Sequence, residues 1–358
     1  MPKILVIADD LSGAAELGAA AYHRGLSSVI CRAEALDSAA DVAVVNTNSR
    51  ALPREAAVAR MAEVGAVVKD AGSDFVFMKI DSVLRGHAGA ESRALRKALG
   101  LRTVLLGAGN PSRERVIRGG VVFVEGVPLH ESPFREDPHF PARTAALGEI
   151  WESTGGVPDK HAELLGETSE PIFSEAALAL TPDTLPVGSL DFFKACLAAW
   201  TSRSPAKAMP ALGHKRRVLL VCGSKAGWPE REERFRSHGW TVRIPTFEGQ
   251  YPAPGRSHEL LGYGPLPPDA PAIDIQKLAA EARATITMAP PDVLALEGGE
   301  TAAAVLEALG WQQLVLRGEL APGTALLQPE GSDLEVAIKP GSYPWPPPLL
   351  ECLLNPPS

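Results

Sequence analysis

A short charged segment, Lys79–Gly86 (KIDSVLRG), directly follows the apolar run Phe75–Met78. It places two cations, Lys79 and Arg85, on either side of one carboxylate, Asp81. Open α/β sheets bind ligands beyond the carboxyl ends of their strands. Lysine binds an anion as a point charge, and arginine binds it through a planar fork of N–H donors. The segment therefore predicts an anion site, although a surface loop with one Asp–Arg pair would contain the same residues.

Two other expected strand ends in the first half contain polar residues of the same kind. Asp9 and Asp10 follow the first apolar run, and Arg50 ends the polar stretch 46–50 (NTNSR) after the second. Adjacent carboxylates need a ligand, a cation or a helix N-terminus, and Ser12 offers an N-cap oxygen to the next helix. Either one carboxylate caps while the other faces a ligand, or both serve the helix. A polyhydroxy carboxylate suits the set, because cations bind its carboxylate and Asp or Asn binds its hydroxyls.

Glycines separate apolar from helical segments in the second half of the chain. Gly223-Ser224 follows the apolar run 217–222, and Gly298-Gly299-Glu300-Thr301 follows the run 293–296. Glycine lets backbone N–H groups approach a phosphate, whose charge a helix N-terminus favours. Neither GxxxxGK[ST] nor GxGxxG occurs, so these turns match no P-loop and no dinucleotide fingerprint. Any one of them alone would more often only reverse the chain.

Alternating strand-like and helix-like segments predict the elements that position these residues. This rhythm indicates an α/β fold of two open, mostly parallel sheets with helices on both faces. The Pro-rich stretch 202–217 is the expected linker between a domain 1–205 and a domain 206–358, with a ligand cleft between them. A hairpin with a two-residue turn is expected at 121–129, whereas 150–186 gives no clear pattern. Strands are expected at 3–8, 42–45, 75–78, 103–106, 217–222, 240–244, 293–296, 314–316, 325–328 and 334–338, and helices at 11–24, 55–71, 87–99, 191–200, 230–238, 275–287 and 302–309.

The composition restricts the class of protein. The chain has 358 residues, 45% hydrophobic and 22% charged, which is typical of a globular protein and long enough for two domains. The net charge of −8 argues against a nucleic-acid partner. No apolar run reaches the ~18 residues that span a membrane, and the N-terminus does not resemble a signal peptide. We expect a cytoplasmic protein with scattered, buried cysteines and no protein-built metal site.

Nine colinear segments give the chain a resemblance to the four-carbon acid sugar kinase family. Members of that family resemble ATP-dependent kinases of 3-oxo-tetronate, threonate or erythronate. The resemblance implies a small sugar acid as substrate and ATP with Mg²⁺ as cosubstrate. The segments are ADDLSGA at 8–14, TNSR at 47–50, KIDSVLRG at 79–86, NPSRERVIRGG at 110–120, EDP at 136–138, PVGS at 186–189, CGS at 222–224, EGGETAAAVL at 297–306 and IKPGS at 338–342.

The resemblance also implies site residues in both domains. The N-terminal domain would bind the sugar acid and the C-terminal domain the nucleotide. Asp10 is expected to orient or deprotonate the reacting hydroxyl, with Asp81 as second candidate, and Glu300 to contact Mg²⁺ through water. Lys79 and Arg85 would bind the carboxylate or stabilise the transferring phosphoryl group. The remaining substrate residues are Asp9, Ser12, Arg50 and Arg115, and the nucleotide residues are Ser224, Gly298, Gly299, Glu300, Thr301 and Gly341.

Two departures from the family pattern keep an alternative open. The region 141–186 is shorter than in typical members, and the tail after Lys339 reads PGSYPW, where many members have a glycine after an aromatic residue. A divergent, non-catalytic sugar-acid binder is therefore the alternative to a kinase, and a homodimer remains an open expectation. A hydroxyacid dehydrogenase is disfavoured, because GxGxxG is absent and the Gly298-Gly299 turn lies late in the chain.

Overall fold

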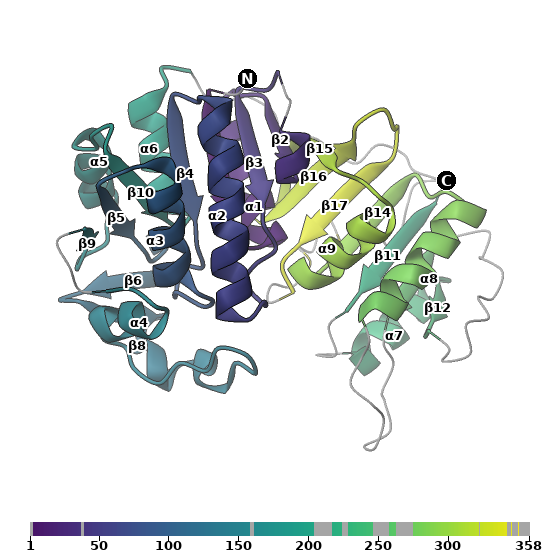
Figure 1. Ribbon diagram of the computed structural model, residues 1–358. Helices are drawn as coiled ribbons and strands as arrows, with labels where there is room; N and C mark the ends of the chain where they lie inside the picture. Colours follow the sequence, from purple (N-terminus) through teal and green to yellow (C-terminus); the bar gives the residue numbers. More distant parts are fainter. Residues whose placement is uncertain are drawn as a thin grey trace. The chain divides into compact units, whose positions relative to one another are not determined.

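The computed structural model describes residues 3–36, 39–157, 161–203, 217–223, 228–245, 258–262, 275–321, 323–341, 345 and 350. The chain divides into two compact units, residues 1–206 and 207–358, and each contains a sheet with helices (Figure 1). The expected α/β fold with mostly parallel sheets is confirmed. Most of the expected linker, and the predicted nucleotide residue Ser224, lie outside the described residues.

The sheet of the first unit is entirely parallel, with the strand order β2-β3-β1-β4-β10-β5-β9. Parallel strands have both faces covered by helices, so they appear in the sequence as unbroken apolar runs. Every residue of β1 is buried accordingly. The strands are β1 (Ile4–Ala8), β2 (Ser28–Cys31), β3 (Val42–Asn46), β4 (Phe75–Lys79), β5 (Thr103–Gly107), β9 (Ala162–Leu164) and β10 (Thr184–Gly188).

Helices of the first unit pack on the two faces of this sheet. Helices α2 and α3 pack against each other, while α1 and α5 both contact α6 (Figure 1). Helix α2 ends at Gly72 and α3 at Gly100, both in the left-handed conformation that favours glycine. The helices are α1 (Leu11–His23), α2 (Arg54–Ala71), α3 (Ala88–Leu99), α4 (Leu147–Ser153), α5 (Glu170–Leu178) and α6 (Leu190–Trp200), with 3-10 turns η1 (Ala33–Ala35), η2 (Pro111–Arg113), η3 (Leu129–Glu131) and η4 (Pro133–Glu136).

A small antiparallel sheet follows β5. It consists of β6 (Arg115–Arg118), β7 (Val121–Val124) and β8 (Val127–Pro128). The predicted hairpin is confirmed, because Glu125 (φ 51°) and Gly126 (φ 81°) form the turn between β7 and β8. This sheet leads into η3 and η4.

The sheet of the second unit has the order β12-β13-β11-β14-β17-β16-β15. The strands from β12 to β17 in this order are parallel, and β16 and β15 then add antiparallel neighbours. The strands are β11 (Val218–Cys222), β12 (Thr241–Arg243), β13 (Glu259–Gly262), β14 (Val293–Glu297), β15 (Gln313–Ala321), β16 (Thr324–Pro329) and β17 (Glu335–Lys339), and the helices are α7 (Trp228–Ser237), α8 (Ile275–Met288) and α9 (Gly299–Ala308).

Each sheet contains a point at which the strand order reverses. In the first unit the chain builds β2 and β3 on one side of β1 and then places β4 on the other side. In the second unit β12 and β13 lie on one side of β11, and β14 lies on the other. Ligands of open α/β sheets bind beyond the carboxyl ends of the strands at such points. The polar strand ends of β1 and β4 and the glycine turns after β11 and β14 occupy these positions.

Five of the described strands were not predicted from the sequence: β2, β6, β9, β10 and β13. Strand β10 contains Pro186 and Gly188, which usually indicate a loop. It lies between β4 and β5 but pairs with β4 only over Val187 and Gly188. The N–H that Pro186 lacks is therefore not needed for the pairing with β4. A side chain at Gly188 would also meet the Gly107 carbonyl oxygen at 2.4 Å.

None of the described helices is long and apolar enough to cross a bilayer. The described cysteines, Cys31, Cys196 and Cys222, are buried thiols, and Cys352 lies outside the described residues. Within the described ranges, no group of three or more His, Cys, Asp or Glu side chains is placed to hold a metal ion.

Candidate functional site

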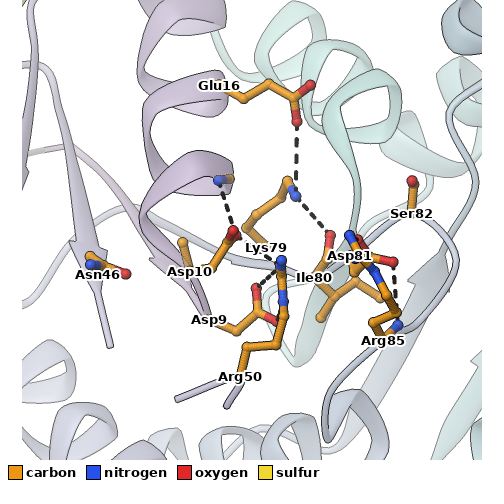
Figure 2. A network of polar contacts seen from close by, with 12 residues as sticks. Asp9, Asp10, Glu16, Asn46, Arg50, Lys79, Ile80, Asp81, Ser82 and Arg85 are labelled. Atoms are coloured by element: carbon orange, nitrogen blue, oxygen red, sulfur yellow. Dashed lines mark hydrogen bonds and ion pairs between the residues drawn. The ribbon is translucent and has the colours of Figure 1, made fainter. Parts of the chain in front are cut away.

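Three neighbouring strands of the first unit end at the same level of the sheet. Ala8, the last residue of β1, is in register with Asn46 of β3 and with Lys79 of β4. The residues that follow these strands therefore meet at one edge, where Figure 2 shows their polar contacts close together. This register explains why Asp9, Arg50 and Asp81, far apart in the sequence, lie close together.

Arg50 binds both carboxylates that follow β1. Its Nε donates to Asp9 Oδ2 at 2.8 Å, and its Nη2 donates to Asp9 Oδ1 at 2.7 Å and to Asp10 Oδ1 at 2.8 Å (Figure 2). Asp9 is only 2% exposed. Burial raises the pKa of Asp9 in spite of the Arg50 guanidinium, and the two carboxylates hold the pKa of Arg50 well above its usual range. The result is a bidentate ion pair in a partly dehydrated setting.

Asp10 caps helix α1. Its backbone is extended (φ −143°, ψ 158°), and its Oδ1 accepts the Gly13 N–H at 3.0 Å. The expectation that Ser12 supplies the cap is wrong, because Ser12 already lies in the first helical turn. Among the described residues, Asp10 Oδ2 has no hydrogen-bond partner, and no hydrogen bond links Ser12 to the network. Asp10 can therefore cap the helix with one oxygen and accept from a ligand with the other.

Lys79 lies beneath this network. It is 5% exposed, and its Nζ donates to the Ile80 carbonyl oxygen at 2.8 Å and lies 3.9 Å from Glu16 Oε2 (Figure 2). A Cβ on Gly13 would lie 3.0 Å from Lys79 Nζ and 2.6 Å from Asp10 Oδ1. Glycine at this position allows α1 to begin close to both groups.

Arg85 bridges two carboxylates on the other side of β4. Its Nη2 donates to Asp81 Oδ2 at 2.8 Å, and its Nη1 donates to Asp137 Oδ2 at 3.2 Å. Asp81 Oδ1 also accepts the N–H groups of Val83 and Arg85. Burial opposes ionisation of Asp81, but Arg85 and Arg50 hold its pKa well below the usual range. Asp81 is therefore a stable anion that shapes the turn after β4, and a weak base.

Arg115 reaches the same region from β6. Its Nη1 donates to Ser82 Oγ at 2.8 Å. The guanidinium carbons of Arg85 and Arg115 lie 5.3 Å and 5.2 Å from the centre of the Phe134 ring, which is cation–π distance. The loop with Phe134 and Asp137 thus brings two arginines together beside Asp81. Asp137 also shapes the turn that follows it, since its Oδ1 accepts the N–H groups of His139 and Phe140.

The second unit brings its glycine turns together at the ends of β11, β14 and β17. Gly298, between β14 and α9, has φ 97°, and its N–H donates to the Lys339 carbonyl oxygen at 2.8 Å. A Cβ on Gly223 would lie 2.0 Å from Thr301 Oγ1, and one on Gly341 would lie 3.6 Å from Gly298 Cα. Gly299 opens helix α9, and Glu300 in its first turn is exposed. This compact backbone at a helix N-terminus suits a phosphate group.

A buried charge cluster around Glu297 supports this turn, although the residue pattern alone did not indicate it. Glu297, the last residue of β14, lies 3.0 Å from Arg231 Nη2 and 3.8 Å from Lys339 Nζ through Oε1, and its Oε2 accepts the Trp345 indole N–H at 2.7 Å. Burial lowers the pKa of Lys339. Glu297 and Lys339 occur in two of the segments that carry the family resemblance, EGGETAAAVL and IKPGS. Their positions beside the glycines of these segments are the feature of the sequence that could have identified them.

Two family models match this chain: a sugar-binding N-terminal domain over residues 4–170 and a nucleotide-binding C-terminal domain over residues 268–343. D-threonate kinase of Salmonella typhimurium is 33% identical over 159 residues. 3-Oxo-tetronate kinase of Burkholderia multivorans is 26% identical over 407 aligned positions. The chain belongs to the four-carbon acid sugar kinase family. The polar network lies within the sugar-binding match and the glycine turn at 298–301 within the nucleotide-binding match.

The two relatives differ in how much of each chain the similarity covers. The match to D-threonate kinase covers 44% of this chain but only 38% of that protein, whereas the match to 3-oxo-tetronate kinase covers 96% and 94%. A solved Salmonella typhimurium protein, described as a candidate tRNA synthase, has a TM-score of 0.77 over 96% of both chains at 18% identity. That likeness establishes the fold alone.

Proposed function

We propose that this protein transfers the γ-phosphoryl group of ATP to a hydroxyl of a four-carbon sugar acid. The observation that carries the proposal is the set of charges at the ends of β1, β3 and β4, where Arg50 pairs with Asp9 and Asp10, Arg85 pairs with Asp81, and Lys79 is buried nearby. A polyhydroxy carboxylate needs this mixture of cations and carboxylates. The names of the curated relatives support a kinase, and the nucleotide-binding match supports ATP as the phosphoryl donor.

Arg50 is the residue we assign to the substrate carboxylate. Its Nε and Nη2 already bind Asp9 and Asp10, whereas its Nη1 has no partner among the described residues. A guanidinium that is held rigidly by two carboxylates loses little further freedom on binding a third. Arg85 and Arg115, which both lie over Phe134, are placed to bind a second anionic group, and the transferring phosphoryl group is the one we assign to them.

Asp10 is the residue we assign to the reacting hydroxyl. Its Oδ2 is available, its side chain is partly exposed, and its other oxygen is fixed by Gly13 and Arg50. In the transfer, the hydroxyl oxygen forms a bond to the γ-phosphorus, the bond to the β,γ-bridging oxygen breaks, and the hydroxyl proton passes to Asp10. Phosphoryl transfer depends mainly on positioning and charge neutralisation, so an aspartate that orients the hydroxyl is sufficient.

The turn at Gly298 is the place we assign to the nucleotide phosphates. The N–H groups at the start of α9 would face them, and Gly223, Gly298 and Gly341 leave the backbone accessible. Mg²⁺ would accompany ATP and neutralise phosphate charge, and Glu300 is the exposed carboxylate nearest in sequence to that turn. The substrate is thus a small molecule, and dimer formation stays a prediction.

A coupled assay of ADP release over D-threonate, D-erythronate and 3-oxo-tetronate tests this function. We expect turnover with at least one of them and a loss of about 100-fold or more in D10N, because the base is removed while asparagine still caps α1. Equal turnover by the wild type and D10N would refute the role of Asp10. A sugar acid that stabilises the protein thermally, with no stabilisation by MgATP and no turnover, would instead indicate a non-catalytic binder.

A further inference from the structure

Glu91 is a buried carboxyl group that the proposed reaction does not use. It lies in the first turn of α3 and is 0% exposed. Its Oε1 contacts the Ser49 hydroxyl, while Oε2 has no hydrogen-bond partner among the described residues. A buried carboxylate with an unpaired oxygen is costly, whereas the neutral acid is much less so. The position of Glu91 behind the loop that contains Arg50 suggests a role in that loop.

The hydroxyl groups around Glu91 allow its proton to be counted. Thr47 Oγ1 lies 3.0 Å from the Ala8 carbonyl oxygen and 2.7 Å from Ser49 Oγ, and Ser49 Oγ contacts Glu91 Oε1. Three hydrogen bonds in series need three hydrogens. The carbonyl oxygen has none, and the two hydroxyls supply one each. An ionised Glu91 can only accept from Ser49, which leaves the contact between Ser49 and Thr47 without a hydrogen when Thr47 donates to Ala8. A neutral Glu91 that donates to Ser49 supplies the third hydrogen, and the complete chain then runs from Glu91 to Ser49, from Ser49 to Thr47 and from Thr47 to Ala8.

This chain fastens the loop after β3 to the end of β1. The N–H groups of Ser49 and Arg50 both donate to the Asp9 carbonyl oxygen, at 2.9 Å and 3.1 Å, and the Thr47 N–H donates to that of Ala8 at 2.9 Å. The hydroxyl chain adds side-chain bonds to the same connection. The orientation of Arg50 toward Asp9 therefore depends on a loop that the Glu91 proton completes.

The charges near Glu91 define the effect of its ionisation. The Asp9 carboxylate and the Arg50 guanidinium act on it from the ends of β1 and β3, and burial followed by Asp9 raises the pKa of Glu91 to about 7. From α2, Arg60 donates to the Thr47 carbonyl oxygen and Arg54 to that of Ser153. Next to α4, the Thr154 hydroxyl oxygen accepts the Gly89 N–H. At the N-terminal end of α3, the Nε2 atom of His87, the residue before the helix, contacts the Leu52 carbonyl oxygen.

We propose that Glu91 is a neutral carboxylic acid in the form of the protein that binds substrate, and that it positions Arg50 by donating its proton to Ser49. This inference rests on the proposed function for its link to sugar acids. Ionisation of Glu91 removes the third hydrogen of the chain and adds a buried negative charge beside Asp9. The added charge makes the surroundings of Arg50 more negative by one unit and so weakens their attraction for a substrate carboxylate.

The matched variant is E91Q. Its amide N–H can donate to Ser49 as the neutral acid does, but the amide cannot ionise. We expect the Kd of the wild type for D-threonate or D-erythronate, measured by titration calorimetry, to rise about tenfold between pH 6 and pH 8.5. We expect E91Q to bind the sugar acid, at every pH in this range, as tightly as the wild type does at pH 6. Because E91Q leaves His87 in place, a pH dependence caused by that imidazole would persist in the variant and overturn the proposal.

A second measurement needs no substrate and therefore separates this proposal from the proposed function. The infrared C=O stretch of a protonated carboxyl group should be present in the wild type at pH 5.5, absent from E91Q, and lost from the wild type between pH 6 and pH 8.5. Its absence from the wild type at pH 5.5, or its presence in E91Q at the same intensity, would show that Glu91 is ionised and would overturn the proposal. If the band behaves as expected but no tetronate binds at any pH, the neutral state of Glu91 stands, and both its link to sugar acids and the proposed function fail.

Discussion

Replacing Arg50 with methionine removes the guanidinium that holds Asp9 through two hydrogen bonds of 2.8 Å and 2.7 Å. Asp9 is 2% exposed, so R50M leaves a carboxylate in a site that water scarcely reaches. Removing one partner of a buried ion pair costs roughly 3–5 kcal/mol. With an m-value of about 2–3 kcal/mol per molar urea, the unfolding midpoint should fall by roughly 1–2.5 M.

Urea unfolding at pH 7, followed by circular dichroism, measures this cost. The control is R102A, because Arg102 and Asp183 form an exposed pair at 3.7 Å, which should be worth no more than about 1 kcal/mol. The double variant D9N/R50M should recover a substantial part of the loss, since it contains no unpaired buried charge. A midpoint for R50M equal to that of the wild type, or a double variant no more stable than R50M, would refute the argument.

Three further predictions concern the two sites and Glu91. G298A should lower the free energy of unfolding by about 1–3 kcal/mol and weaken ATP binding measured by calorimetry, because Gly298 has φ 97°. The control is G310A: Gly310 has φ 72° with open space around it, so this variant should be destabilised without a change in ATP affinity. D81N should be less stable than the wild type at pH 7, as measured by urea unfolding. This difference in stability should shrink as pH falls below about 4, because a carboxyl group with a lowered pKa stabilises the folded state only while it is ionised. E91Q should have a free energy of unfolding about 3 kcal/mol higher than the wild type at pH 8 and equal to it at pH 4. The reason is that a carboxyl group whose pKa is raised from 4.5 to about 7 favours the folded state only at low pH. Free energies of unfolding that change with pH in parallel for the two proteins would contradict this.

The sequence predicted the residues at the strand ends well. In a parallel sheet the strands end together, so polar residues directly after β1, β3 and β4 must meet, and Asp9, Asp10, Arg50, Lys79 and Asp81 do. Their pairing could not be predicted in the same way. Which carboxylate Arg50 binds, and which oxygen of Asp10 remains available, depend on side-chain geometry that residue spacing does not determine.

The residues that sequence analysis missed come from other kinds of segment. Glu91 lies in a helix among Ser, Arg and Lys, where a glutamate usually faces solvent, and only the tertiary fold buries it. Asp137 and Phe134 lie in a loop about 50 residues after Arg85, so nothing local indicates that they contact it. Strand β10 was missed because Pro186 and Gly188 contradict strand propensity, while the packing around Gly107 requires the small residue.

The central claim is that a sugar-acid hydroxyl receives the γ-phosphoryl group of ATP. Phosphorus NMR of the wild type with MgATP and each tetronate tests it most directly. The account predicts a new phosphate monoester signal, coupled to a carbinol proton, that forms at the same rate as ADP and is lost in D10N. Release of inorganic phosphate alone, or no consumption of ATP with any of the sugar acids, would contradict it.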